Sequence, residues 1–164
     1  MKHIPILTIV VLLTLACRFF GLGGTTIVSS DLDPYKGQVA TLLPKEAGDS
    51  VIKFKLDSSQ PTSFPGAKEA VKADYTMQAG SIGVKAQLTI VNFASRQEAE
   101  AAMQAFATSH NLTLENKTKN GKTVGKRLVY NDGKAIMWSN GSLQCLSFSD
   151  FAKTSSNLED ALQF

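Results

Sequence analysis

Two side chains of this sequence, His110 and Cys145, are the candidates for a catalytic base and a nucleophile. Nucleophilic hydrolysis requires a base within hydrogen-bond reach, and the only histidine beyond position 3 is His110. His110 follows an expected helix, where an imidazole caps carbonyl groups and favours the helix dipole. Cys145 stands beside Leu143 and Leu146 in an expected strand, and a lone buried cysteine packs as a small hydrophobic residue. We therefore expect a capping or exposed His110 and a core Cys145, with a small hydrolase or redox enzyme as the alternative.

Other arrangements of reactive groups are incomplete. The chain has two cysteines and two histidines, one of them His3, which excludes a four-cysteine zinc module. Gly121-Lys122-Thr123 matches the end of a phosphate-binding loop, but that loop needs a glycine where Asn116 stands. We expect no metal, no cofactor and no catalysis.

Two sets of residues are candidates for binding. The first is a run of five cations within eleven residues: Lys117, Lys119, Lys122, Lys126 and Arg127. On a hairpin near a membrane, these cations can contact anionic head groups, and they can equally form a solvated strand edge that discourages aggregation. The second set is Trp138 with Tyr130 or Tyr75, which could line a ligand pocket, although core packing is the commoner role of such rings.

The first 17 residues have the pattern of a targeting segment. Lys2 precedes the apolar stretch Ile4–Leu15, whose 12 residues would span about 18 Å as a helix. This is shorter than the roughly 30 Å hydrocarbon core of a bilayer and is typical of an export signal. An uncleaved anchor that runs through Leu22, with Arg18 reaching the interface, is an alternative, as is a cleaved signal for soluble secretion.

Two parts of the chain resemble bacterial lipoproteins. Thr14-Leu15-Ala16-Cys17 resembles their lipobox, with Ala16 and Cys17 in place and the leucine displaced by one position. The resemblance implies that Cys17 is lipidated and holds the chain in a bacterial envelope. Phe93-Ala94-Ser95-Arg96-Gln97-Glu98-Ala99 and Trp138-Ser139-Asn140-Gly141 loosely resemble segments of small, uncharacterised extracytoplasmic lipoprotein domains.

The composition fits one small domain behind this segment. We expect residues 1–17 to be a signal peptide or membrane anchor, residues 18–33 a flexible tether, and residues 34–164 a single domain. Without Lys2 and Arg18, 15 of the 17 basic residues remain against 14 acidic ones, a net charge of +1. A nearly neutral domain lacks the electrostatic footprint of a nucleic-acid-binding protein.

The pattern of apolar residues predicts the elements of this domain. Strict alternation over Ile82–Phe93 predicts a long strand, paired with Ala73–Met77. Ser95 and Glu98 form a capping box for a helix that ends near His110, and Ser156 with Glu159 forms another at the C-terminus. A short helix is expected over Pro65–Lys72, and the turn residues that predict hairpins are Asn120-Gly121, Asn131-Asp132-Gly133 and Asn140-Gly141.

Together these elements predict an α+β domain. We expect a mainly antiparallel sheet of about five to seven strands, with two or three helices on one face, behind an N-terminal signal or anchor helix. The sequence favours a membrane-tethered, extracytoplasmic binding or accessory module, which contacts the membrane through its N-terminus and binds a small ligand or another envelope protein. A structural envelope protein is the alternative, and a secreted protein is the alternative location.

Overall fold

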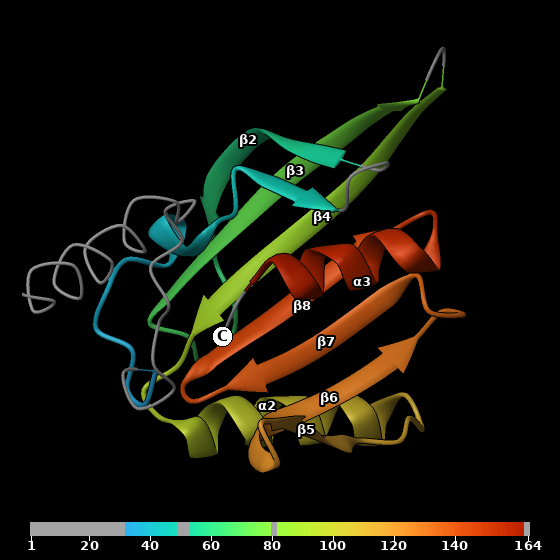
Figure 1. Cartoon of the computed structure of the whole chain (residues 1–164). Coiled ribbons are helices and arrows are strands. Elements are labelled where there is room, and N and C mark those ends of the chain that lie inside the picture. The colour runs from blue at the N-terminus through green and yellow to red at the C-terminus, as the bar shows by residue number, and fades with distance from the viewer. Residues whose placement is uncertain (1–31, 49–52, 80–81, 163–164) are drawn as a thin grey trace, which may run out of the picture.

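The computed structural model describes residues 32–48, 53–79 and 82–162, which form one eight-stranded sheet with two α-helices (Figure 1). The N-terminal segment expected to be a signal or anchor helix, including Cys17, lies outside the described residues. In chain order the elements are η2 (Val39–Leu42), β1 (Glu46–Gly48), β2 (Lys53–Thr62), β3 (Glu69–Ala79), β4 (Ile82–Asn92), α2 (Arg96–Ser109), β5 (Glu115–Lys119), β6 (Lys122–Tyr130), β7 (Ala135–Asn140), β8 (Leu143–Ser149) and α3 (Ala152–Ala161).

Two antiparallel meanders make up the sheet. The strand order is β1-β2-β3-β4-β8-β7-β6-β5, so the last strand of each meander lies beside the last strand of the other. The junction pairs Ala86 with Ser149 and Asn92 with Leu143. All the strand pairs are antiparallel. The expected α+β class with a mainly antiparallel sheet is therefore confirmed.

The strongest sequence patterns correspond to real elements. β4 alternates as predicted, with Val84, Ala86, Leu88 and Ile90 buried on one face, and it pairs with β3 along its whole length. The Ser95 hydroxyl accepts a hydrogen bond from the Glu98 N–H at 3.3 Å, so the predicted cap begins α2. The three predicted hairpin turns lie between β5 and β6, β6 and β7, and β7 and β8. Local sequence therefore determines one of the two longest strands and the turns of the second meander.

The two helices cover opposite faces of the sheet, which corrects the expectation of helices on one face. Neighbouring residues in β7 show this directly, because side chains alternate between the faces of a strand. Met137 packs in a cluster with Met103 and Ala107 of α2. Ile136 and Trp138 pack instead in the main core with Leu158 of α3. We call these sides the α2 face and the α3 face.

Other expectations about elements were wrong. The sheet has eight strands rather than five to seven, because β1 has only three residues and shows no apolar alternation. The expected helix over Pro65–Lys72 is a turn that leads into β3. Ser156 and Glu159 do not form a capping box, because α3 begins at Ala152 and both residues lie inside it.

The folded part begins earlier than Pro34, where the sequence placed the end of the tether. Leu32 is fully buried in the main core, and its carbonyl accepts a hydrogen bond of 2.6 Å from the Ser142 N–H. Gly141 has a φ of +58°, and a Cβ at that position would overlap the Leu32 carbonyl. The first described residue, Leu32, is therefore fixed at the β7–β8 turn. Across the described ranges, the helices are too short or too polar to cross a bilayer.

Candidate functional site

Cys145 is part of the main core. Its side chain lies on the α3 face of β8 and is 1% exposed. Burial raises the pKa of the thiol well above its ordinary range, and nearby Glu159 adds to this, against the opposing charge of Lys117. The thiol is therefore protonated and shielded from solvent, which does not suit a nucleophile.

His110 is the C-cap residue of α2, as the sequence predicts. Its Nδ1 lies 2.9 Å from the Phe106 carbonyl oxygen and 2.9 Å from the Ser109 hydroxyl. The imidazole also stacks on the Phe106 ring, with 4.1 Å between the ring centroids. These contacts hold the ring at the end of the helix, on the opposite face of the sheet from Cys145.

The structure does not bring together the three rings of the candidate ligand pocket. Tyr75 and Trp138 are fully buried in the core of the α3 face. The Tyr75 hydroxyl donates to the Pro44 carbonyl at 2.9 Å, and burial raises the pKa of this tyrosine well above its ordinary value. Tyr130 packs with the α2 cluster on the other face. Trp138 and Tyr75 therefore have the packing role that the sequence left as the commoner one.

The predicted run of cations divides into two groups. At the base of the β5–β6 hairpin, Lys117 and Arg127 bind Glu159 of α3, with N–O distances of 2.9 Å and 3.0 Å. Lys126 donates to the Asn116 side-chain oxygen at 2.8 Å. Lys119 and Lys122 lie exposed at the tip of the hairpin.

The Glu159 carboxylate is the centre of a mostly buried ion cluster. Its side chain is 10% exposed, and both of its oxygens accept hydrogen bonds from Arg127. Burial alone would raise the pKa of Glu159, but the hydrogen bonds and charges of Arg127 and Lys117 outweigh this effect and lower the pKa below 4.5. Lys117 also lies 5.0 Å from the centre of the Trp138 ring. The cluster joins α3 to the β5–β6 hairpin, so its first role is to fix those two elements together.

Sequence reasoning missed this cluster for a physical reason. Lys117 and Arg127 are separated from Glu159 by 42 and 32 positions. No local pattern indicates which surface cation meets which acid over such distances. The sequence held one indication of this cluster, a glutamate on an expected helix together with a hairpin rich in cations.

The unpartnered buried polar atoms lie on both faces of the sheet. In the described part of the chain these are Trp138 Nε1, Asn140 Nδ2, Gln144 Oε1 and Asn157 Nδ2. Gln144 lies on the α2 face, since its amide donates to Met137 Sδ, whereas Trp138 lies on the α3 face. Within the same ranges, no group of three His, Cys, Asp or Glu side chains is placed to hold a metal ion.

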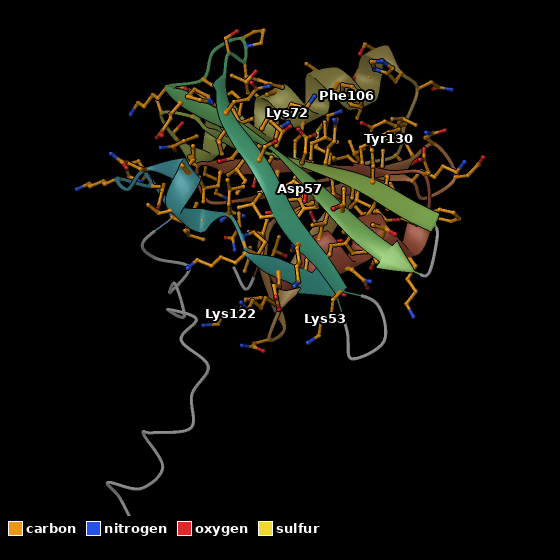
Figure 2. All side chains as sticks on the ribbon, turned by 90° about the horizontal axis from the view of Figure 1, so that it is seen from above. Lys53, Asp57, Lys72, Phe106, Lys122 and Tyr130 are labelled. Carbon is orange, nitrogen blue, oxygen red and sulfur yellow. The ribbon has the colours of Figure 1, made fainter. Side chains whose placement is uncertain are left out.

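The α2 face is only half covered. Helix α2 packs mainly on β6, β7 and β8, and its Ala99 also covers Ala70 of β3 and Val91 of β4. The rest of the same face of β2, β3 and β4 is bare. In Figure 2, Lys72 of this bare half lies on the same side of the sheet as α2 and its Phe106. We call this surface the open face, and strand register and alternation assign to it Ser58, Gln60, Lys72, Asp74, Thr76, Lys85, Gln87 and Thr89.

Hydrogen bonds order the polar groups of the open face. Asp74 is central, because its two carboxylate oxygens accept from Gln87 Nε2 at 2.9 Å and from the Ser58 hydroxyl at 3.3 Å. Thr76 donates to the Asp57 carboxylate at 2.9 Å. These contacts hold amide, hydroxyl and carboxylate groups of three strands in fixed positions.

An aromatic border adjoins the open face. Strand register places Phe148 of β8 directly beside Gln87 on one side and Ala135 on the other. The Phe148 side chain is 41% exposed. Tyr130 of β6 is paired with Ala135 and is half-buried. The centre of its ring lies 5.4 Å from the centre of the Phe106 ring. Burial raises the pKa of Tyr130 above its ordinary value of 10.0, so its hydroxyl stays neutral and can donate a hydrogen bond. One row across the sheet therefore carries aromatic, amide and carboxylate groups in sequence.

The chain matches no family model, no curated protein and no solved structure. The resemblance of its N-terminus to bacterial lipoproteins therefore stays a prediction from the sequence.

Proposed function

We propose that this protein is a membrane-tethered, extracytoplasmic binding or accessory module without catalysis, and that it engages its partner through the open face. The N-terminal segment supports the tethering, through its basic start, its apolar stretch and Cys17. The positions of Cys145 and His110 favour a non-catalytic role, because the thiol is buried and protonated and the imidazole is engaged in capping.

The observation on which the binding surface depends is the row from Tyr130 to Asp74. Antiparallel sheets often leave one polar face in solvent, so polarity alone does not indicate a partner. Here an exposed phenylalanine adjoins an amide and a carboxylate that are already held in place by hydrogen bonds. A partner that covers Phe148 gains apolar burial, and the fixed polar groups lose little freedom on binding.

Site-specific photo-crosslinking in a bacterial host tests this function. A photoreactive phenylalanine analogue in place of Thr89 lies on the open face beside the row, and one in place of Asp160 lies exposed on α3. We expect a defined adduct in the membrane fraction from position 89 and none from position 160. Phe148→Ser in the position 89 variant should reduce the yield of that adduct. Equal yields from both positions, or a yield that Phe148→Ser does not change, would contradict the proposal.

The intact mass of the chain from the same membranes tests the tethering. A species that begins at Cys17 and carries a diacylglyceryl group supports a lipoprotein, and an unprocessed chain in the membrane supports an uncleaved anchor. A chain recovered only in the soluble cytosolic fraction would refute the extracytoplasmic location.

A further inference from the structure

The sequence contains the dipeptide Asn-Gly twice, and the structure places the two copies in opposite surroundings. Asn120-Gly121 joins β5 to β6, and Asn140-Gly141 leads from the last residue of β7 into the turn before β8. In this dipeptide the backbone nitrogen of the glycine can attack the side-chain carbonyl of the asparagine, because glycine has no side chain to hinder the approach. The attack requires access for water and a backbone that is free to bring the two groups together. The surroundings of each dipeptide therefore decide whether it reacts.

The β5–β6 turn is open to solvent. Asn120 and Gly121 are both exposed, and a Cβ placed on Gly121 would meet no atom within 4 Å. Their φ values of +51° and +73° are those of a tight hairpin turn, which the pair Lys119–Lys122 closes. β5 is the last strand at one edge of the sheet, and the register of the two strands shifts within the pairs behind the turn. Opening this turn therefore disturbs the end of an edge hairpin and no part of the core.

The β7–β8 turn is closed by its contacts. Asn140 is only 2% exposed, and Gly141 is buried so close to the Leu32 carbonyl that a Cβ would overlap it. The next residue, Ser142, donates its N–H to the Leu32 carbonyl at 2.6 Å, and its own carbonyl accepts a hydrogen bond of 2.9 Å from the Phe93 N–H. Rotation of the backbone at Asn140 would break these contacts. A reaction there therefore requires the turn and the core around it to unfold.

We propose that Asn120 is a site of spontaneous deamidation in the folded protein, whereas the fold protects Asn140. The Gly121 nitrogen loses its proton to solvent and bonds to Asn120 Cγ. The bond from Cγ to Nδ2 then breaks, and the departing nitrogen takes a proton from solvent and leaves as ammonia. Water opens the resulting cyclic imide at either of its carbonyl groups, which yields aspartate or isoaspartate. The reaction consumes only water, and neither an oxidant, a partner nor a membrane takes part.

Both products change the hairpin turn. Each replaces a neutral amide by a carboxylate at position 120, between Lys119 and Lys122. Isoaspartate also adds a carbon atom to the backbone, so the turn no longer has the geometry that matches the twist of the two strands. The base of the hairpin is held separately, because Lys117 and Arg127 bind Glu159 there. The change is therefore confined to the turn and the pairs next to it.

Peptide mass spectrometry of the purified full chain during incubation in mildly alkaline buffer tests the proposal. Fragmentation of the peptides distinguishes aspartate from isoaspartate. We expect Asn120 to react at least about a hundredfold faster than Asn140, because an exposed turn opens at little cost whereas opening the core approaches the free energy of global unfolding. In concentrated urea the two rates should become equal, since the fold no longer protects Asn140. The rate at Asn120 should rise with pH, because the nitrogen attacks in its deprotonated form.

A matched pair of variants separates the chemistry from the shape of the turn. Aspartate tolerates a left-handed backbone, and the space around position 121 is empty, so Gly121→Asp should keep the turn. Its side chain should hinder the attack and slow deamidation of Asn120 at least about tenfold. Gly83→Asp, at a position in β4 with equally open space, should leave the rate unchanged. An Asn120 that reacts only in urea, equal rates at both asparagines in the folded protein, or a rate that Gly121→Asp does not change would overturn the inference and leave the proposed binding function standing.

Discussion

At the scale of single residues, Glu159 links distant parts of the chain. It receives hydrogen bonds from Lys117 and Arg127 while only 10% of its side chain is exposed. Removing one member of a buried ion group lowers the free energy of unfolding by more than the intact group contributes to it. The remaining charges are then left inside the protein without a partner. Glu159 therefore fixes the position of the β5–β6 hairpin relative to α3.

Replacing Glu159 by glutamine should lower the free energy of unfolding at neutral pH by about 2 kcal/mol. This is below the roughly 3–5 kcal/mol of a fully buried pair, because the side chains of Lys117 and Arg127 keep 15% and 30% exposure. Urea unfolding followed by the fluorescence of the single tryptophan, Trp138, measures the change. Glu115→Gln, an exposed change in the same hairpin, serves as the control and should have little effect.

The pH dependence of this difference has a defined sign. Because the folded-state pKa of Glu159 is lowered, its contribution is fully present above the ordinary value of 4.5 and is lost as the pH falls through the folded-state pKa. The difference between the wild type and Glu159→Gln should therefore shrink as the pH falls below 4.5. A difference that stays constant into acid would show that the charge of Glu159 does not matter.

At the scale of elements, sequence predicts structure where one local pattern is sufficient. The alternation in β4, the Ser95 cap of α2 and the asparagine-glycine turns are local, and all were predicted. Elements that depend on distant contacts were not predicted. β1 is a strand because it pairs with β2. The face of the sheet on which each helix lies is set by its packing against residues far away in the sequence. The open face was missed for the same reason, since it depends on where α2 packs.

Gly125 shows such a constraint within an element. A methyl group there would overlap the Ser139 carbonyl of the neighbouring strand, so Gly125→Ala should separate β6 from β7. Overpacking of this kind costs about 1–3 kcal/mol. Gly83→Ala in β4 is the matched control, because a Cβ there has no atom within 4 Å. Unfolding free energies that fall equally in both variants would show that the close approach at Gly125 is not the cause.

At the scale of the whole molecule, the two ends of the sheet differ. Leu32 and the β7–β8 turn lie at one end, whereas the large hydrophobic side chains exposed within the described ranges, Val129, Phe148 and Phe151, lie toward the other end. This difference between the ends is consistent with the proposed tethering through the N-terminal segment. It depends on Leu32 being part of the fold rather than part of the tether.

Leu32 should therefore contribute to stability as a core residue. A polar network holds its surroundings: Tyr35 N–H donates to the Ser142 hydroxyl at 2.8 Å, and that hydroxyl donates to Asn92 Oδ1 at 2.9 Å. Leu32→Ala in the full chain should cost about 2–5 kcal/mol, as for other large-to-small changes in a packed core. Val129→Ala, at a position that is 41% exposed, should cost less than about 1 kcal/mol. If urea unfolding followed by Trp138 fluorescence gives Leu32→Ala the small cost of an exposed position, Leu32 is not part of the core, and the fold begins later in the chain than Leu32.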